Sequence, residues 1–309
     1  MVNKPLPLLN PKTKQPVTVE DLAHIFNLEC SKQELDTQHA WIDIPEPVRE
    51  MYTYYRATPL VRAYALEKAL DTPAHIYFKN ESVNPLGSHK INSALAQCYY
   101  CKQEGTTNVT TETGAGQWGA ALSYAAKIFG LEAAVYQVKI SMQQKPYRSS
   151  IMRTFGATVE GSPSMSTRAG KDIITRDPHH QGSLGTAISE AIELATTTPH
   201  CKYTLGSVLN HVSLHQTVIG LEAEKQMAMA GEYPDKVIAC FGGGSNFSGL
   251  AFPFMRHNLL DGKQTEFIAA EPSSCPKLTR GKFEYDFGDE AGYTPVSYTH
   301  LRAHETLRY

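Results

Sequence analysis

An alternation of strand and helix patterns from Ala74 onward is the feature that most limits how this chain can fold. Ala74–Asn80 and Lys236–Phe241 are short, largely apolar runs of the kind that form strands. Between such runs apolar residues recur at helical spacing, as they do after Ile91. Strands that alternate with helices form parallel sheets with helical crossovers. The sequence therefore predicts an α/β fold with mostly parallel sheets.

The same patterns predict the other elements. Strands are expected at Asn108–Glu112, Ala133–Val138, Ala157–Glu160, Tyr203–Leu205 and Glu266–Ala270. Besides the helix after Ile91, helices are expected at Thr18–Leu28, Trp118–Phe129, Ser149–Phe155, Leu184–Ala195, Asn210–Ala230 and Phe247–Leu259. Ligands of α/β folds bind at the carboxyl ends of strands, and the motifs described next all follow predicted strands.

The composition of the 309 residues excludes several classes of protein. A chain that is 41% apolar and 19% charged can bury a sizeable core, which argues against global disorder. A formal net charge of −2 provides no basic surface for nucleic acid or for an anionic membrane. The sequence contains no apolar run of about 18 residues, so no membrane span is expected. Its N-terminus is rich in proline and lacks an apolar signal segment, so we predict a cytoplasmic protein.

The six cysteines are scattered along the chain and are expected to be reduced, as in an intracellular protein. Cys98 and Cys101 form a single CxxC motif, but a zinc site needs a second ligand pair at suitable spacing. We therefore expect no metal site, and we interpret the two cysteines as buried positions on one helix.

A glycine-rich turn follows the strand predicted at Lys236–Phe241 and opens a helix. It consists of Gly242, Gly243, Gly244, Ser245 and Asn246. Glycines let the backbone approach a ligand, and a helix N-terminus adds partial positive charge, so such a turn binds anions, most often phosphate. The turn matches neither the GxGxxG dinucleotide motif nor a P-loop. It predicts a phosphate monoester site, with a purely structural glycine turn as the alternative.

A second turn, Gly87–Asn92, precedes another predicted helix and contains His89 and Lys90. The positive end of a helix and a nearby imidazole both favour the neutral, nucleophilic form of a lysine. Such a lysine can form a Schiff base. Most lysines at the start of a helix are simply solvated, so this turn alone does not establish the role.

A third turn, Glu112–Gly119, again joins a predicted strand to a helix. Its glycines form another cradle of N–H groups that can hold a carboxylate. Glu112, at the end of the strand, can serve in proton transfer. A tight structural turn with a solvated glutamate is the alternative.

In combination the three turns are far more specific. Together with Thr58-Pro59-Leu60 they resemble, in order and spacing, the motifs of the pyridoxal-phosphate enzymes with the tryptophan synthase β-chain fold. Leu205–Gly220 and Arg280–Pro295 are similar to the second, divergent type of these β chains, in which Trp118 stands where the commoner type has histidine. The resemblance extends over about residues 40 to 295.

The resemblance implies two three-layer α/β/α domains with mostly parallel sheets, the fold-type II architecture of pyridoxal-phosphate enzymes. Residues 1–50 would form an N-terminal arm, and residues 87–208 the substrate domain. Residues 51–86 and 209–295 would form the two segments of an incomplete phosphate-binding domain. Val296–Tyr309 carries no family pattern, so we interpret it as a non-native tail on a chain whose C-terminal part is missing.

The resemblance also implies roles for single residues. Lys90 is similar to the lysine that binds the cofactor and moves the Cα proton of L-serine. Glu112 is similar to the carboxylate that assists hydroxide loss and orients indole. The cofactor would be bound by Lys90, His89, Asn92, Gly242, Gly243, Gly244, Ser245 and Asn246, with its phosphate at the glycine turn and with Glu81 as support. The substrate carboxylate would be bound by Thr113, Gly114, Ala115, Gly116 and Gln117.

The implied activity joins L-serine and indole to L-tryptophan, with pyridoxal 5′-phosphate as cofactor. The full-length form would be a homodimer that can work with an α-type subunit and needs neither nucleic acid nor a membrane. Another fold-type II enzyme, such as a cysteine or threonine synthase, remains an alternative. A fragment that binds phosphate or the cofactor without turnover is a second alternative, from a different class.

Overall fold

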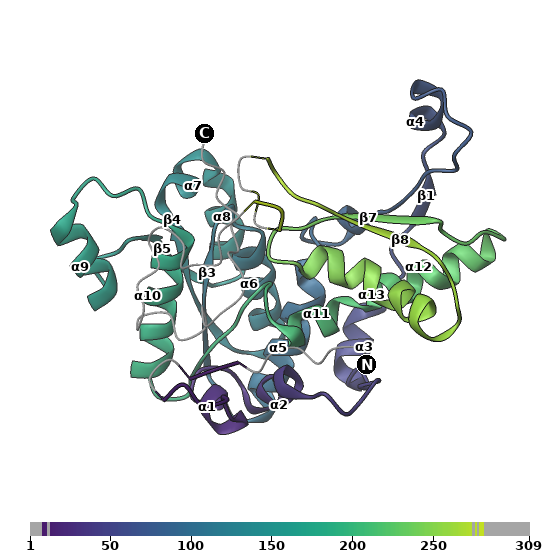
Figure 1. The fold of residues 1–309 in the computed structure, drawn as a ribbon. Helices are drawn as coiled ribbons and strands as arrows, with labels where there is room; N and C mark the ends of the chain where they lie inside the picture. Colours follow the sequence, from purple (N-terminus) through teal and green to yellow (C-terminus); the bar gives the residue numbers. More distant parts are fainter. Residues whose placement is uncertain (1–7, 11–12, 274–275, 277, 281–309) are drawn as a thin grey trace.

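The computed structural model describes residues 8–10, 13–273, 276 and 278–280, and the structural statements below concern these residues. Helices and strands alternate around a parallel sheet, so the predicted α/β class is confirmed (Figure 1). No helix in this part of the chain is both long enough and apolar enough to cross a membrane.

The largest sheet has four parallel strands in the order β5-β4-β3-β6. They comprise β5 (Thr158–Ser162), β4 (Glu132–Val138), β3 (Asn108–Thr113) and β6 (Cys201–Tyr203). Strand β3 is buried at every residue after Asn108, because it pairs on both sides and is covered on both faces. The sequence-predicted strands in this region therefore lie side by side in one sheet.

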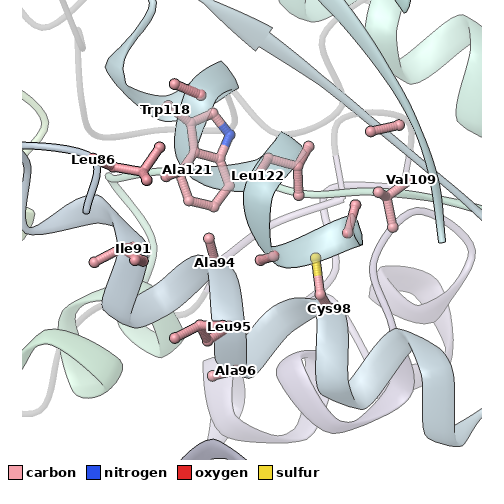
Figure 2. Close-up of a cluster of buried hydrophobic side chains, with 14 of the residues drawn as sticks. Leu86, Ile91, Ala94, Leu95, Ala96, Cys98, Val109, Trp118, Ala121 and Leu122 are labelled. Carbon is pink, nitrogen blue, oxygen red and sulfur yellow. The ribbon is translucent and has the colours of Figure 1, made fainter. Parts of the chain in front are cut away.

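Helices cover both faces of this sheet. They are α5 (Lys90–Gln103), α6 (Gln117–Phe129) and α8 (Pro146–Thr154) on one face, and α10 (Leu184–Thr197) on the other. Successive residues of β4 point to opposite faces of the sheet. Val135 packs in the first core, with α5, α6 and α8, and Tyr136 packs in the second core, with α10. Figure 2 shows the first core, where small side chains such as Ala94 and Ala121 lie between α5 and α6. This part of the molecule is a three-layer α/β/α unit of the predicted kind.

Two small sheets lie beside this unit, one of them antiparallel and one parallel. Their strands and the helices next to them are β1 (Leu60–Arg62), β2 (Tyr77–Lys79), α12 (Val218–Met229), β7 (Lys236–Cys240), α13 (Ser245–Leu260) and β8 (Glu266–Ala270). Helices α12 and α13 pack on the face of β7 that carries Val237 and Ala239. Ile238 lies on the opposite face of β7, and in the described part of the chain its side chain is exposed. In the described part of the chain β7 thus has one covered face, whereas the resemblance implies a sheet that is covered on both faces.

Several elements differ from the sequence-based expectation. The strand predicted at Tyr203–Leu205 is found two residues earlier, at Cys201–Tyr203, and its pairing with β3 ends at Tyr203. The strand predicted at Ala74–Asn80 is short and pairs antiparallel with β1, a strand that the sequence pattern did not indicate. The long helix predicted at Asn210–Ala230 is two helices, α11 (Asn210–Gln216) and α12, which meet at Thr217. The hydroxyl and the N–H of Thr217 both donate to the carbonyl of Leu214, three residues earlier, which interrupts the α-helical ladder there.

The predicted N-terminal arm contains three helices, α1 (Val19–Ala23), α2 (Leu28–Leu35) and α3 (Glu46–Tyr52). The sequence pattern indicated a single helix at Thr18–Leu28. The side chains of Thr18 and Asn27 cap α1 and α2, which explains why two separate helices form. The remaining short elements are α4 (Tyr64–Ala69), the 3-10 helix η1 (Glu81–Val83), α7 (Lys139–Gln144) and α9 (Arg168–Arg176).

Two sequence-based interpretations concern the cysteines and the chain end. Cys98 and Cys101 are free and buried on α5, which confirms the interpretation of the CxxC motif as two buried helix positions. The described residues contain no cluster of side chains that could hold a metal ion. The tail predicted at Val296–Tyr309 lies outside the described residues, and the proposed domain boundaries remain predictions.

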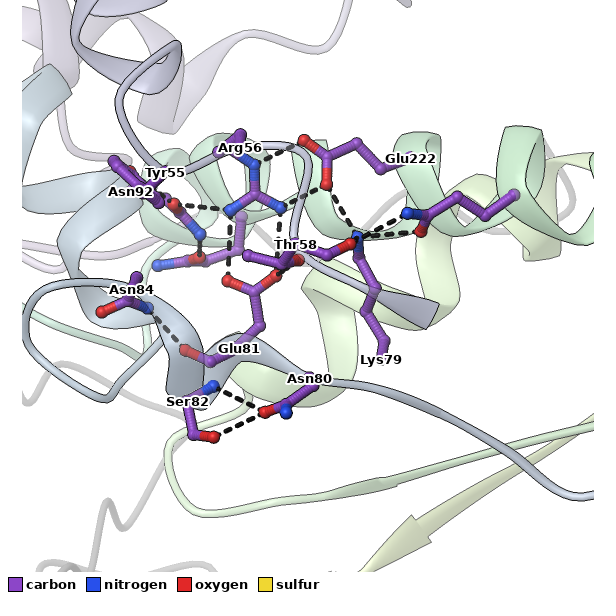
Figure 3. A network of polar contacts seen from close by, with 12 residues as sticks. Tyr55, Arg56, Thr58, Lys79, Asn80, Glu81, Ser82, Asn84, Asn92 and Glu222 are labelled. Carbon is purple, nitrogen blue, oxygen red and sulfur yellow. Dashed lines mark hydrogen bonds and ion pairs between the residues drawn. The ribbon is translucent and has the colours of Figure 1, made fainter. Parts of the chain in front are cut away.

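A buried ion-pair network joins the β1–β2 segment to α12 and α5 (Figure 3). The Arg56 side chain, only 4% exposed, donates two hydrogen bonds to Glu81 at 3.0 and 3.1 Å and two to Glu222 at 2.6 and 2.8 Å. Lys79 donates to Glu222 at 2.8 Å, and Arg56 also donates to Asn92 on α5 at 2.9 Å. Burial acts to raise the pKa of Glu222, but the hydrogen bonds from Arg56 and Lys79 outweigh burial, so the pKa is lowered.

We expect Arg56→Met to lower the free energy of unfolding by about 3–5 kcal/mol, because the carboxylates of Glu81 and Glu222 lose their main partner. Urea unfolding followed by circular dichroism measures the change. Arg49→Met, at an exposed position of α3, is the matched control and should cost less than about 0.5 kcal/mol. Equal losses in the two variants would contradict a stabilising role for the network.

Candidate active site

Lys90 is the first residue of α5, in the turn that follows β2 and η1. Its side chain is buried, and its amine donates a hydrogen bond of 3.0 Å to the carbonyl oxygen of Gly206. Gly206 comes shortly after the end of β6, so the lysine reaches the carboxyl edge of the central sheet. Ligands of α/β folds bind at that edge.

The glycine-rich turn lies beside this lysine. Gly242–Gly244 connect β7 to α13, and Gly244 has a φ of +101°, a conformation that favours glycine. Ser245 is the first residue of α13, and its hydroxyl lies 3.1 Å from Nε2 of His89. The predicted phosphate turn and the predicted lysine turn are therefore adjacent in space.

His89 is neutral in this environment. Burial, followed by the charge of neighbouring Lys90, lowers the pKa of His89 to about 3. A neutral imidazole carries one N–H donor and one acceptor nitrogen. At neutral pH His89 therefore offers hydrogen bonding next to the glycine turn without adding a charge.

Glu112 lies near the carboxyl end of β3, and it is buried. The hydroxyl of Tyr203, at the end of β6, donates a hydrogen bond to Oε2 of Glu112. Burial, and then the nearby carboxylate, raises the pKa of Tyr203 well above its ordinary value, so the phenol remains a donor. A neighbour on a strand that pairs with β3 thus fixes the orientation of Glu112.

Residues 203–208 connect these groups, because Tyr203 binds Glu112 and Gly206 binds Lys90. The same segment binds the glycine-rich turn through hydrogen bonds from the Ser245 N–H to Ser207 Oγ (3.3 Å) and from the Val208 N–H to the Gly243 carbonyl (3.0 Å). The sequence predicts a short strand at Tyr203–Leu205 and a family resemblance from Leu205 onward, but neither indicates that this stretch is a junction. A short strand followed by a glycine and a serine was the signal that could have identified it.

The third predicted turn closes on the same edge of the sheet. Gly116 has a φ of +100°, and a Cβ at this position would lie 2.6 Å from Cβ of Arg148. The hydroxyl of Thr113 accepts from the N–H of Gly119 at 3.2 Å, which ties the end of β3 to the first turn of α6. The turn Thr113–Gln117 thus brings the N-terminus of a 13-residue helix to the end of β3, a position suited to an anion.

Comparison with known proteins identifies the family of the chain. A family model described as "Pyridoxal-phosphate dependent enzyme" matches residues 51–297. The tryptophan synthase beta chain 2 of Thermotoga maritima is 54% identical over 290 residues, which cover 94% of this chain and 68% of that protein. The tryptophan synthase beta chain of Thermococcus gammatolerans is 54% identical over 299 residues, which cover 96% and 68%. This chain belongs to the tryptophan synthase beta chains. Its cofactor is therefore pyridoxal phosphate, as the sequence predicts.

The fold of this family member is also similar to that of a solved structure, a threonine deaminase. The TM-score is 0.57 at 22% identity, and the match covers 75% of this chain and 65% of that chain. At this identity the likeness concerns the fold alone. It confirms the fold-type II architecture that the resemblance implied.

The geometry of the glycine-rich turn fits the phosphate group of this cofactor. A Cβ at Gly243 would lie 2.4 Å from Oγ of Ser207, so the turn is closed on that side by residues 203–208. A Cβ at Gly242 would meet no atom within 4 Å, so the turn is open there. A phosphate has room on the open side, at the N-terminus of the 16-residue helix α13.

We expect Gly243→Ala to weaken the affinity for pyridoxal phosphate at least about tenfold, or about 1.4 kcal/mol, because the added methyl group displaces the turn from Ser207. Titration of cofactor-free protein, followed by the visible absorption of the bound cofactor, measures the dissociation constant. Gly161→Ala is the control, since its Cβ would meet Met142 at an ordinary 3.4 Å. Similar constants for the two variants would contradict the close packing behind Gly243.

Two other predicted cofactor residues have different surroundings. Asn246 lies in the first turn of α13, next to the glycine-rich turn. Asn92 is fully buried in the Arg56 network, where its side-chain oxygen accepts from Arg56 and Tyr55 and its nitrogen donates to Gln216. These contacts favour a supporting position for Asn92 behind the lysine, and direct contact between Asn92 and the cofactor remains a prediction.

Proposed function

We propose that the chain catalyses the β-replacement reaction that condenses L-serine with indole to L-tryptophan, with pyridoxal 5′-phosphate as cofactor. One observation carries the proposal: a lysine amine and a carboxylate are both held by residues 203–206, through Gly206 and Tyr203. A β-replacement needs a base at the substrate Cα and a proton-transfer group at the leaving group. The names of the close relatives support the same reaction.

In this proposal two side chains of the chain move protons. When bound, the cofactor supplies a conjugated ring that accepts electrons from the substrate Cα. Lys90 would hold the cofactor covalently until the amine of serine takes its place, and the released Lys90 amine would then take the Cα proton of serine and later return it. Glu112, oriented by Tyr203, assists the loss of hydroxide and binds the N–H of indole.

Backbone N–H groups at two helix N-termini bind the anionic ends of the ligands. The turn Gly242–Asn246 binds the cofactor phosphate, and neutral His89 adds a hydrogen bond beside it. The turn Thr113–Gln117 binds the carboxylate of serine. Neutral donors hold both anions in place, while the charged and titrating groups stay available for chemistry.

We further infer a homodimer in the full-length form and an α-type subunit as the partner that supplies indole. Both inferences rest on the family resemblance, as does the division into a substrate domain and a phosphate-binding domain. A cytoplasmic location is also part of the proposal. Size-exclusion chromatography with and without such a subunit tests the two assembly states.

The experiment that tests the function uses the purified chain with pyridoxal phosphate, L-serine and indole. Tryptophan, detected by liquid chromatography, should form only when all three are present. Sulfide in place of indole, with an O-acylated serine, tests a cysteine synthase activity in parallel. Cofactor binding seen as a visible absorption band without any turnover would overturn the catalytic proposal in favour of binding alone.

A further inference from the structure

Gln97 connects the helix of Lys90 to the segment that receives the lysine amine. Lys90 and Gln97 both belong to α5 and are about two helical turns apart, so they lie on one face of the helix. Gln97 is only 1% exposed. Its Oε1 accepts from the N–H of Leu205 at 3.1 Å, and its Nε2 donates to the carbonyl of Leu205 at 2.8 Å.

This double contact replaces hydrogen bonds that the sheet no longer supplies. Strand β6 ends at Tyr203, so the backbone of Leu205 has left the ladder with β3 while the residue is still buried. A buried backbone N–H and carbonyl need partners, and the Gln97 amide provides both. The Nε2 group of Gln97 also donates to Ser93 at 2.9 Å, which fixes the orientation of the amide.

Trp118, on α6, packs on the residue that follows Leu205. A Cβ at Gly206 would lie 2.4 Å from Cδ2 of Trp118, so the indole ring packs directly on Gly206. The ring N–H of Trp118 donates to Thr111 at 2.6 Å, and the Thr111 hydroxyl donates to the carbonyl of Thr204 at 2.6 Å. Residues 204–206 are thereby held at three consecutive positions.

We propose that Gln97 is a positioning residue of the active site. By fixing the backbone of Leu205, Gln97 holds the carbonyl of the next residue, Gly206, in place. That carbonyl accepts a hydrogen bond from the Lys90 amine whenever the amine is not bonded to the cofactor. The inference rests on the proposed function only in taking Lys90 as the residue that binds the cofactor. A reacting group displaced by about 1 Å can lose about 10²-fold in rate, so a fixed acceptor for the amine has a direct kinetic consequence.

The first test measures how fast cofactor-free protein captures pyridoxal phosphate. Gln97→Met keeps the size of the side chain and removes its hydrogen bonds, whereas Gln97→Glu keeps the acceptor for the Leu205 N–H. Covalent attachment is followed by the visible absorption band, and borohydride trapping with peptide mapping locates it. We expect attachment at Lys90 to be about tenfold slower in Gln97→Met and intermediate in Gln97→Glu.

A matched control separates positioning from general destabilisation. Val159→Ala removes buried methyl groups on β5, which β4 and β3 separate from β6, and should leave the rate of attachment unchanged. If Val159→Ala slows attachment as much as Gln97→Met does, the effect is general destabilisation and the proposal is overturned.

A second test needs no cofactor. In cofactor-free Gln97→Met the Leu205 amide should exchange its hydrogen at least about tenfold faster, while the amides of β3 stay protected. The emission of Trp118 should shift to longer wavelength as its ring loses the contact with Gly206. The chain has two tryptophans, so a Trp41→Phe background isolates this signal.

Each outcome decides one part of the inference. Unchanged hydrogen exchange at the Leu205 amide would show that Gln97 does not fix this backbone. Faster exchange with an unchanged rate of cofactor attachment would overturn the positioning role. If the unaltered protein forms no covalent band at all, the proposed function fails, and the inference fails with it. The control reaction of the unaltered protein therefore distinguishes the two failures.

Discussion

Lys90→Ala should abolish the covalent attachment of pyridoxal phosphate. In the unaltered protein borohydride should fix the cofactor on the peptide that contains Lys90, because this amine lies beside the glycine-rich turn at the carboxyl edge of the sheet. Lys90→Ala should lose that product, and turnover should fall at least about 10²–10⁴-fold, the contribution of a general acid–base group. Some cofactor affinity should remain, because the turn Gly242–Asn246 is unaltered.

Lys102→Ala provides the matched control, since Lys102 is an exposed lysine on the same helix. Visible absorption before and after borohydride, followed by mass spectrometry of the peptides, is measured for both variants and for the unaltered protein. The control should behave like the unaltered protein. Detection of the cofactor on a lysine other than Lys90 would refute the assignment.

Glu112→Gln should separate substrate binding from turnover. The amide keeps an acceptor for the Tyr203 hydroxyl but cannot exchange a proton with the substrate, so the site should retain its shape. We expect serine to change the visible spectrum of the cofactor-loaded variant as it does in the unaltered protein. The rate of tryptophan formation should fall about 10²–10⁴-fold.

The control for this prediction is Glu190→Gln on α10. Glu190 is also fully buried, and its carboxylate accepts hydrogen bonds from Ser164 and Thr167, outside the proposed site. Steady-state kinetics with serine and indole should give a turnover number close to that of the unaltered protein. Near-normal turnover in Glu112→Gln would assign Glu112 a structural role only.

The local elements of the fold could be predicted from the sequence with good agreement. The strand at Glu266–Ala270 is found as predicted, and those at 108–112 and 133–138 each differ by one residue. The strands at 133–138 and Glu266–Ala270 are largely apolar, whereas the strand at 108–112 is marked by β-branched valine and threonine. The pattern failed where tertiary contacts or local hydrogen bonds overrule it, as at Thr217, whose hydrogen bonds to Leu214 divide one apolar stretch into two helices.

The three turns of the candidate site could likewise be found from the sequence, because each contains glycine and follows a predicted strand. Gly116 and Gly244 indeed have the positive φ values for which glycine is suited. Distances between the turns are not encoded in such patterns. Asn92 illustrates this limit. It lies in the same turn of α5 as Lys90, but Asn92 contacts Arg56 whereas the amine of Lys90 contacts Gly206.

The sequence by itself determined the α/β class and the glycine turns, and through them the family, because backbone conformation and apolar periodicity depend on residues close in the chain. Only the tertiary structure decided which groups meet at the site. Tyr203 reaches Glu112 from 91 residues away, and Gln97 reaches Leu205 from 108 residues away. Such contacts arise because parallel strands bring their carboxyl ends to one edge of a sheet, where buried polar groups must find partners in space rather than in sequence.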